Sequence, residues 1–349
     1  MKNYKENLIY LCGNDGTDTR ISKEVFTLSK KYQVIYIGIK SNTPFRHKYL
    51  NYKLFKGSHK NIFTLIKMNL YLFYILFFKK IKINRIHVVD EQFYLFFIPL
   101  LSLFKMHITL DIFDSIFLKF SLPRNKFLLA KKIIYNSCNR LIVTDENRFN
   151  LMPEFAKKIT SILPNVPFEN KKFIEPKPII KSSLVIAYFG TLAKNRGSEF
   201  IKKLIDANRN VKILVAGWVT DDFTNSLIVD NPKIIQFLGT INQNEANKLL
   251  YEKCHYLICV YPFDNINNIY ASPNKIYDAI QTRTPVIMND EIIASDFVKK
   301  NNIGFTFSSK NLDFVKINLE LIKNKNKLLN NNELHNKFVW DNYEKILID

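Results

Sequence analysis

Short apolar runs alternate along the chain with longer segments of helical periodicity. In the first half, the apolar runs predict strands at residues 8–11, 34–39, 86–89, 108–110 and 141–143, with helices at residues 21–30 and 61–78. The second half restarts the pattern, with strands predicted at residues 184–189, 211–215, 234–238, 256–260, 286–288 and 305–307. Helices are predicted there at residues 198–207, 245–251, 273–281 and 292–299. Such alternation is typical of α/β folds built on parallel sheets.

The length of the chain and one polar segment indicate two domains. The chain has 349 residues, whereas single hydrophobic cores stop growing at about 250–300 residues. Residues 168–181 are charged and contain Pro176 and Pro178, as expected of an interdomain linker. We therefore expect one domain over residues 1–172, a second over residues 173–332, and a C-terminal helix over residues 333–349 that packs back toward the first domain. Two doubly wound domains would bind ligands at the carboxyl ends of their strands.

The segment from Ser272 to Asp278 has the features of an anion-binding helix N-terminus. Ser272 is a favourable N-cap, and Pro273 suits the first helical position because it has no N–H to leave unpaired. Free N–H groups and the helix dipole attract phosphate there. Asn274 and Asp278 are four residues apart on one helix face, so the carboxylate can accept hydrogen bonds from ribose hydroxyls. A nucleoside diphosphate fits this arrangement, and so does an ordinary capped helix of an α/β domain.

A glycine turn follows the first predicted strand of the second half. Gly190 and Thr191 lead through Lys194 and Arg196 to Gly197. Glycine lets the backbone approach an anion, and the two cations can neutralise a diphosphate. The alternative is a surface loop whose lysine and arginine are only solvated.

The positive charge lies mainly in the first half. Residues 1–172 carry 29 Lys and Arg against 12 Asp and Glu, which gives +17; residues 173–349 carry 22 against 19, which gives +3. Nucleic acid, an anionic membrane surface or an acidic lipid-linked substrate would each account for this charge. Residues 69–82 run from an aromatic, apolar stretch into lysines, which fits either a membrane surface or a helix buried against the sheet.

Other features of the sequence favour a cytoplasmic protein. The longest apolar runs, residues 70–78 and 93–104, are shorter than the ~20 residues that span a bilayer. Residues 1–7 lack the pattern of a signal peptide. The four cysteines are scattered without zinc-site spacing, so we expect them to be reduced.

The order of these motifs resembles that of the GT-B glycosyltransferases, specifically the large retaining family four. The matching motifs of the second half are Gly190-Thr191-Leu192, Arg196-Gly197, Phe237-Leu238-Gly239, Pro273-Asn274-Lys275 with Asp278, and Pro285-Val286-Ile287. Those of the first half are Asp18-Thr19-Arg20-Ile21, Ile86-His87 with Asp90, Leu110-Asp111-Ile112-Phe113-Asp114, and Leu163-Pro164-Asn165-Val166-Pro167. The resemblance covers nearly the whole chain and implies two Rossmann-like, doubly wound domains that face each other across a cleft.

The resemblance implies transfer of a sugar from a nucleotide-diphosphate donor with retention at the anomeric carbon. The nucleotide sugar would be a co-substrate, and neither a metal nor another cofactor is expected. The residues implied in donor binding are Gly190, Thr191, Arg196, Ser272, Asn274, Lys275 and Asp278. Arg196, Lys275 and the start of the helix would stabilise the departing diphosphate, whose own oxygen can accept the acceptor proton.

The acceptor side is implied in the first half. Asp111 and Asp114 would orient acceptor hydroxyls as catalytic residues, or else form a capping or solvated loop pair. Asp90, at a strand end, is the third catalytic candidate, and Asp18 and Arg20 are acceptor-side candidates. His87 lies on an apolar strand, where a core role fits better than catalysis.

Three positions depart from the family pattern. Thr191 replaces an arginine of the phosphate loop, Tyr270 replaces the first of two frequent glutamates, and Phe113 replaces a frequent histidine. These departures leave open a weakened site or an unusual donor.

The leading hypothesis is a glycosyltransferase that adds a sugar to a glycan acceptor, lipid-linked, in bacterial surface polysaccharide synthesis. It would be cytoplasmic and peripheral on the inner face of the cytoplasmic membrane, with an anionic membrane surface as partner. The alternatives are a weakened GT-B homologue that acts as a partner subunit, a sugar-nucleotide 2-epimerase, and a nucleic-acid-binding protein. Nucleic acid is not expected, because the aromatics lie in apolar runs rather than among arginines.

Overall fold

A computed structural model describes residues 5–41, 45, 47–48, 50–79, 81–120, 127–310, 312–327, 329 and 331–348. The sequence interpretations that involve residues 1–4 and Lys80 lie outside this set. Unit 1 comprises Met1–Pro164 and Tyr343–Asp349, and unit 2 comprises Asn165–Asn342. The chain therefore passes between units at residues 164/165 and 342/343, whereas the sequence predicts domain boundaries at residues 172/173 and 332/333.

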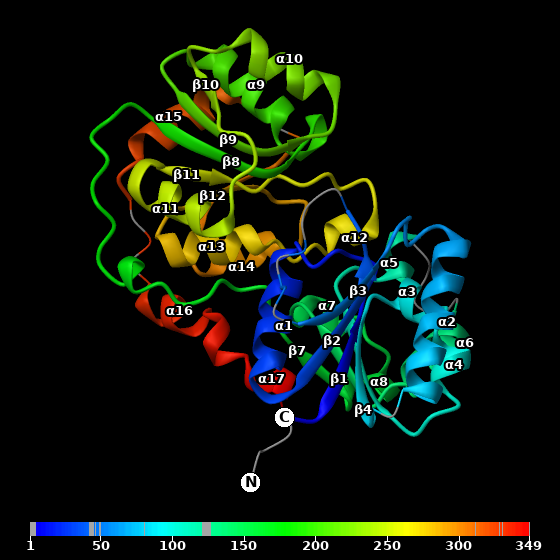
Figure 1. Cartoon of the computed structure of the whole chain (residues 1–349). Coiled ribbons are helices and arrows are strands. Elements are labelled where there is room, and N and C mark those ends of the chain that lie inside the picture. Colours follow the sequence, from blue (N-terminus) through cyan, green and yellow to red (C-terminus); the bar gives the residue numbers. More distant parts are fainter. Residues whose placement is uncertain are drawn as a thin grey trace. The chain divides into compact units, whose positions relative to one another are not determined.

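Unit 1 is built on a seven-stranded parallel sheet with the order β3-β2-β1-β4-β5-β6-β7 (Figure 1). Its strands are β1 (Asn7–Leu11), β2 (Gln33–Ile39), β3 (Asn51–Phe55), β4 (Ile83–Val89), β5 (His107–Ile112), β6 (Arg140–Val143) and β7 (Thr160–Ile162). Its helices are α1 (Thr19–Lys31), α2 (Ile62–Phe78), α3 (Glu91–Leu95), α4 (Ile98–Leu101), α5 (Ile116–Lys119), α6 (Leu128–Asn136), α7 (Glu146–Asn150), α8 (Glu154–Lys157) and α17 (Lys345–Ile348).

The two faces of this sheet are covered differently. Ile9, Leu11, Ile86 and Val88 share one core with side chains of α2, α3, α4, α6 and α8. Alternate residues of a strand point to opposite faces, so Tyr10 and the residues in register with it lie on the other face, under α1. Helix α17 contacts α1, and Glu344, the residue just before α17, forms an ion pair with Lys30 of α1 at 2.6 Å.

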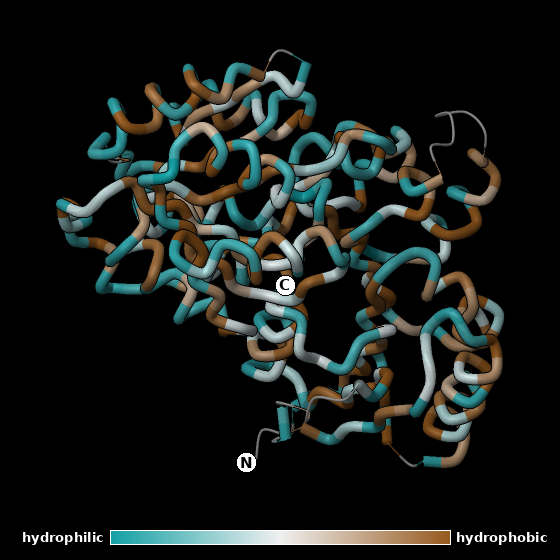
Figure 2. Tube along the Cα trace, turned by 90° about the horizontal axis from the view of Figure 1, so that it is seen from above, coloured by the Kyte–Doolittle hydropathy of each residue, from teal (hydrophilic) through white to brown (hydrophobic). Residues whose placement is uncertain are grey.

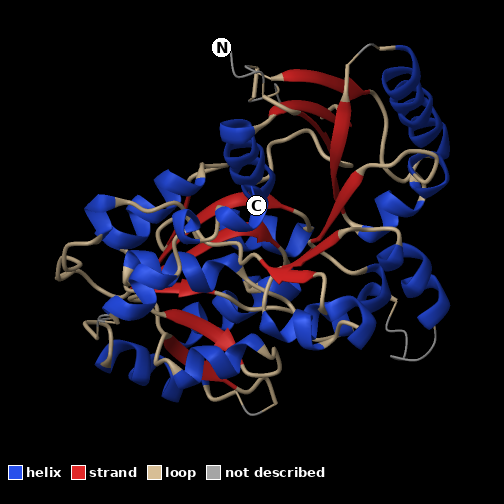
Figure 3. Ribbon diagram, turned by 90° about the horizontal axis from the view of Figure 1, so that it is seen from below, coloured by secondary structure: helices blue, strands red, loops and turns tan. Residues whose placement is uncertain are grey.

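Unit 2 is built on a six-stranded parallel sheet with the order β10-β9-β8-β11-β12-β13. Figure 3 draws the strands of both units in red among the helices. Its strands are β8 (Val185–Leu192), β9 (Lys212–Val219), β10 (Ile235–Phe237), β11 (Tyr256–Ile258), β12 (Val286–Asn289) and β13 (Gly304–Phe307). Its α-helices are α9 (Ser198–Ala207), α10 (Asp222–Asp230), α11 (Gln243–Lys253), α12 (Ile266–Ile269), α13 (Asn274–Thr282), α14 (Ala294–Lys300), α15 (Phe314–Lys323) and α16 (Asn332–Lys337). Its 3-10 helices are η1 (Lys171–Phe173), η2 (Lys194–Arg196) and η3 (Trp340–Asn342).

Helices cover both faces of the second sheet as well. Ile186 and Tyr188 of β8 pack in a core with α9, α10 and α15, whereas Val185, Ala187 and Phe189 pack in a second core with α11. The expected fold class is confirmed: each unit is a doubly wound, Rossmann-like parallel sheet. The winding reverses direction between β1 and β4 in unit 1 and between β8 and β11 in unit 2. In such sheets, ligands bind beyond the carboxyl ends of the strands at this reversal.

The C-terminal part of the chain differs from the sequence prediction. The sequence predicts one helix from residue 333 onward, but α16, η3 and α17 occupy this segment. The N–H of Trp340 donates to the Pro167 carbonyl at 2.8 Å and Trp340 is fully buried, so the backbone leaves the helix at Phe338.

Helix α2 is buried only on the side of Thr64, Met68, Leu72 and Ile75. Among the described helices, none is both long and apolar enough to cross a membrane.

Candidate functional site

The carboxyl ends of β8 and β11 in unit 2 form a site built on glycine. Gly190, near the end of β8, has φ +108°, and Gly217 of β9 has φ +137°. A Cβ on Gly217 would lie 1.8 Å from the Gly190 carbonyl oxygen, so only glycine fits where the two strands approach each other. Thr191 follows on β8 and is half-buried, and the chain then turns through η2. The glycine turn therefore lies at the reversal point of the sheet.

Two cations from different elements converge at this turn. Lys275, in the first turn of α13, donates from Nζ to the Ile258 carbonyl at the end of β11, at 3.2 Å. The guanidinium carbon of Arg196 lies 5.3 Å from the ring centroid of Tyr261. Burial lowers the pKa of Lys275, and the charge of Arg196 lowers it further. Among the residues that the structure describes, no carboxylate forms an ion pair with either cation, so the site carries positive charge that an anion would balance.

The start of α13 differs in detail from the sequence prediction. The helix begins at Asn274, its N-cap is Pro273, and no side chain caps it. The prediction of Ser272 as N-cap is therefore wrong: Pro273 has ψ 119°, so the first helical turn opens one residue later than expected. Asn274 and Ser272 are half-buried beside this uncapped turn. Among the side chains that the structure describes, none caps this turn, as an anion-binding turn requires.

Asp278 lies one turn further along α13 and is 8% exposed. Its Oδ1 accepts hydrogen bonds from Gln243 Nε2 at 2.8 Å and Asn247 Nδ2 at 3.1 Å, both from α11. The two amides hold the carboxylate in a fixed orientation on the face that it shares with Asn274. Tyr270 is half-buried at the end of α12, where its N–H donates to the Ile266 carbonyl at 3.0 Å.

A second group of polar residues lies in unit 1, between α1 and the sheet. Arg20 Nη2 donates to both carboxylate oxygens of Asp111, at 2.9 and 2.8 Å, and Arg20 Nε donates to Glu24 Oε1 at 2.8 Å. Arg20 Nη1 donates to the Leu163 carbonyl at 2.6 Å, and Tyr10 OH donates to Glu24 Oε2 at 2.6 Å. Arg20, Glu24 and Asp111 are at most 2% exposed. We call Tyr10, Arg20, Glu24, His87 and Asp111 the buried network.

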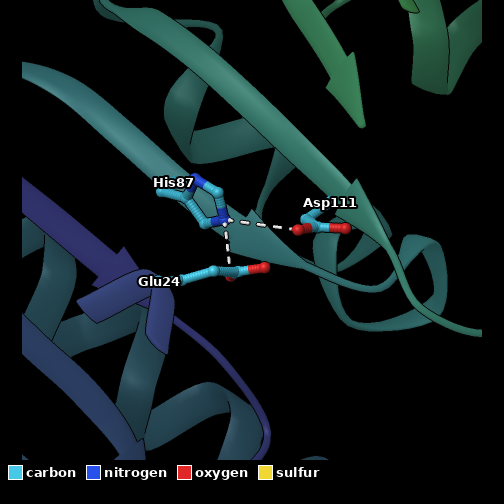
Figure 4. A group of neighbouring side chains, drawn as sticks. All are labelled: Glu24, His87 and Asp111. Atoms are coloured by element: carbon cyan, nitrogen blue, oxygen red, sulfur yellow. Dashed lines mark ion pairs between the residues drawn. The ribbon is translucent and has the colours of Figure 1, made fainter. Parts of the chain in front are cut away.

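His87 completes this buried network. Its Nε2 lies 3.3 Å from Glu24 Oε2 and 4.0 Å from Asp111 Oδ2. Figure 4 shows the imidazole pointing toward both carboxyl groups. Its ring stacks on that of Tyr10 at 4.9 Å. Burial lowers the pKa of His87 to about 4, so the imidazole is neutral at pH 7. Burial raises the pKa of Asp111, and the Arg20 guanidinium only partly opposes this. One cation therefore faces two carboxyl groups, and a proton on Asp111 makes the network neutral.

The spacing of Glu24, His87 and Asp111 also matches that of metal ligands, because their ligand atoms lie within 4.8 Å of one another. However, Arg20 already binds both carboxyl groups, and its charge would repel a metal ion at the same position. These residues therefore do not fit a metal site with Arg20 in place.

Asp90 lies just beyond the carboxyl end of β4, at the reversal point of the first sheet. It has φ +67°, an unusual conformation for a residue other than glycine. Its Oδ1 accepts hydrogen bonds from the N–H groups of Phe113 and Asp114, both at 3.2 Å. Burial raises the pKa of Asp90 to about 7. This carboxyl group can therefore exchange a proton near neutral pH.

The other acceptor-side candidates fall into two groups. Asp114 and Asp18 are exposed: Asp114 pairs with Lys119 and Arg148, both at 3.5 Å, and Asp18 caps α1 by accepting from Arg20 N at 2.8 Å. Asp111 and Arg20 are buried and hydrogen-bonded to each other, so neither side chain reaches the surface where an acceptor would bind, contrary to the sequence prediction. The sequence reasoning also missed Glu24, whose place four residues after Arg20 on the buried stripe of α1 was the available signal.

Comparisons with solved structures identify the fold. The chain is similar to sucrose-phosphate synthase from Thermosynechococcus elongatus, with 14% identity, TM-score 0.71, and coverage of 98% of this chain and 97% of that chain. It is also similar to the lipopolysaccharide outer core galactosyltransferase WaaB in its apo form, with 13% identity, TM-score 0.62 and 97% of both chains covered. A third match is HepE from Anabaena in complex with UDP and glucose, with 11% identity, TM-score 0.63, and coverage of 98% of this chain and 94% of that chain.

No protein-family model matches the sequence, and no curated protein sequence matches it. The structural matches extend over nearly the whole chain and both units. The chain has the GT-B fold, as the order of its motifs predicts.

Proposed function

We propose that this chain is a glycosyltransferase that takes its sugar from a nucleotide-diphosphate donor, of the retaining family-four type. The observation that carries the proposal is the pair Lys275 and Arg196 at the reversal point of the second sheet. Both cations lack a carboxylate partner among the described residues, and the uncapped first turn of α13 lies beside them. Asp278 offers a fixed carboxylate one helical turn away, where a ribose attached to the diphosphate would find an acceptor for its hydroxyl groups.

The donor site proposed here comprises Gly190, Thr191, Arg196, Ser272, Asn274, Lys275 and Asp278. Glycine at position 190 lets the diphosphate approach the backbone, and the cations with the positive end of α13 stabilise the charge that develops on the leaving diphosphate. These residues supply that stabilisation without a metal ion. Transfer with retention follows from the resemblance to family four, and the departing phosphate oxygen accepts the acceptor proton.

On the acceptor side, we propose that Asp90, just beyond the carboxyl end of β4, orients an acceptor hydroxyl group by a hydrogen bond, while the departing phosphate oxygen takes the proton. Asp114 and Asp18 are exposed, and we propose that they contact the acceptor. Asp111 and Arg20 are reassigned as positioning residues, since both are buried and Asp111 lies in the strand whose end holds Phe113 and Asp114.

The proposed acceptor is a lipid-linked glycan of bacterial surface polysaccharide synthesis, and the protein would work at the inner face of the cytoplasmic membrane. The charge distribution supports this part of the proposal: residues 25–89 contain thirteen lysines and arginines and neither aspartate nor glutamate. Such a segment favours an anionic lipid surface. The similar galactosyltransferase WaaB is described as acting on the lipopolysaccharide outer core.

The test is calorimetric titration of the protein with UDP, GDP, dTDP, CMP and ADP. We expect saturable binding of one of them, and K275Q and R196Q should each weaken it by about 1.5–3 kcal/mol, or roughly 10–150-fold in Kd. K194Q is the matched control, because Lys194 is an exposed residue of the same turn and should leave Kd within about twofold.

Two results would contradict the donor site. One is the absence of binding by any nucleotide. The other is unchanged binding by folded K275Q and R196Q proteins. Nucleotide binding without transfer to any lipid-linked acceptor would instead favour the partner-subunit alternative, which the tyrosine at position 270 keeps open.

A further inference from the structure

One face of α2 is apolar and yet exposed. The helix is hydrophobic over most of its length, as the colours along its coil show (Figure 2). The side toward the sheet carries Thr64, Met68, Leu72 and Ile75, all at most 5% exposed. The opposite side is the outward α2 face, which consists of Phe63, Ile66, Leu70, Phe73, Phe77 and Phe78. Phe63, Leu70 and Phe78 are 71%, 64% and 69% exposed.

The outward α2 face is a continuous stripe. From Phe63 to Phe77 its residues recur every three or four positions, which places them on one side of a helix, and Phe78 follows directly at the helix end. The rings of Phe73 and Phe77 lie 4.3 Å apart, and those of Tyr74 and Phe78 stack at 6.1 Å. A 17-residue helix is about 25 Å long. Single exposed apolar side chains are common, but a contiguous apolar stripe of this length marks an interaction surface.

The charge around the stripe decides between possible partners. Lys60, Lys67 and Lys79 are exposed at its start, within it and at its end. No acidic residue occurs in the sequence from residue 25 to residue 89. A second copy of this chain would bring two acid-free, basic faces together, and like charges would repel. An anionic lipid surface offers apolar acyl chains for the aromatic rings and negative headgroups for the lysines.

We propose that the outward α2 face inserts into the headgroup region of an anionic phospholipid bilayer, with the axis of α2 parallel to the membrane plane. The described helices include none that could span a bilayer, so the contact is peripheral. This inference deepens the proposed function, because it names the surface that contacts the membrane. It rests on the proposed function only for the purpose of that contact, which is to reach a lipid-linked acceptor. Lipid binding itself is measured without nucleotide, sugar or acceptor, so failure of one proposal is distinguishable from failure of the other.

The experiment is co-sedimentation of the full chain with vesicles of phosphatidylcholine alone or with about 40% phosphatidylglycerol, which gives the second set of vesicles an anionic surface. We expect binding to the anionic vesicles at low salt that weakens at least about tenfold at high salt. The triple variant F63Q/L70Q/F78Q should weaken binding at least about tenfold at either salt concentration. Because all three side chains are exposed, the circular dichroism spectrum and Tm should not change.

The matched control is V229Q/V315Q/L319Q. It removes three side chains of unit 2 that are exposed to a similar extent, and it should leave vesicle binding within about twofold. A second readout tests insertion: tryptophan in F77W should be quenched by brominated lipids, whereas tryptophan in L319W should not.

Three results would overturn the proposal. Binding that the F63Q/L70Q/F78Q variant retains would place the membrane contact elsewhere. A dimer in light scattering that this variant dissociates, without vesicle binding by the wild type, would assign the stripe to a second copy. Salt-sensitive binding to an oligonucleotide without vesicle binding would assign the basic residues to nucleic acid.

Discussion

The buried network of unit 1 gives the sharpest stability prediction. Arg20 makes four hydrogen bonds of 2.6–2.9 Å to Leu163, Glu24 and Asp111, and it is 2% exposed. In R20M, two carboxyl groups that are 0% exposed lose their cation. Removal of one partner from a buried ion pair costs about 3–5 kcal/mol, so we expect R20M to destabilise unit 1 by about 4 kcal/mol at pH 8.

The loss in R20M should depend on pH. Burial raises the pKa of Asp111, and without the Arg20 cation nothing in that pair opposes the shift, so folded Asp111 binds its proton more tightly than unfolded Asp111 does and stability falls as pH rises. The destabilisation should therefore be smaller at pH 5 than at pH 8. D111N should cost less than R20M, because the amide oxygen of the substituted side chain would still accept a hydrogen bond while Arg20 and Glu24 form a balanced pair.

The assay must distinguish the two units. Trp218 and Trp340 both belong to unit 2, so tryptophan fluorescence follows unit 2 alone. Hydrogen exchange of the amides in β4 and β5 reports on unit 1 and gives its local free energy of opening. K30M is the control on the same helix: the Lys30–Glu344 pair is partly exposed, so its loss should cost less than about 1 kcal/mol. A loss in R20M no larger than that in K30M would refute the reasoning.

Three other predictions concern buried or strained positions. Burial raises the pKa of Asp90 to about 7, so the stability of unit 1 should fall as pH rises from about 4 to 7. Asparagine tolerates the positive φ of this position, so D90N should fold. Hydrogen exchange of the β4 amides should show a smaller loss of stability with pH in D90N than in the wild type. Burial lowers the pKa of Lys177 from 10.5 to about 7, so the stability of unit 2 should rise with pH between those values, and K177M should lose this rise in tryptophan-monitored unfolding. G217A should destabilise unit 2 by about 3 kcal/mol or more in the same assay, whereas G239A, which has φ +68° and open space around its Cβ position, should cost about 1 kcal/mol. An equal effect of both glycine substitutions would contradict the steric argument.

The alternation of apolar runs predicted the central strands well because these strands are buried on both faces. The edge strand β3 was missed, since Asn51, Tyr52 and Lys53 are exposed and break the apolar run. The same limit applies to β7, which has only three residues. In the first sheet the hydrophobic pattern therefore predicts the interior strands and misses both edge strands, whereas in the second sheet it also predicts the edge strands β10 and β13.

The candidate sites show a different limit. Glycine, proline and cation spacing in the sequence pointed to the turn that we propose as the phosphate site, because the residues of each motif are close in sequence. The hydrogen-bond donors to Asp278 come from α11. The sequence around Gln243 and Asn247 contains no motif that predicts this contact. Asp111 reads as a loop carboxylate in the sequence, yet Arg20 from a distant helix buries it. Contacts between elements far apart in the chain decide whether a charged residue meets solvent or another side chain.

The order in which the two units can be completed follows from the place of α17. Unit 1 includes residues Tyr343–Asp349, and Glu344 pairs with Lys30 of α1, yet all of unit 2 lies between these residues and Pro164 in the sequence. On the ribosome, unit 2 therefore has its whole sequence available before unit 1 does. Unit 1 lacks its residues Tyr343–Asp349 until all of unit 2 has been synthesised, and the outward α2 face is made long before that point. A chain that has emerged from the ribosome only as far as Asn342 would thus present the whole sequence of unit 2 and an incomplete unit 1.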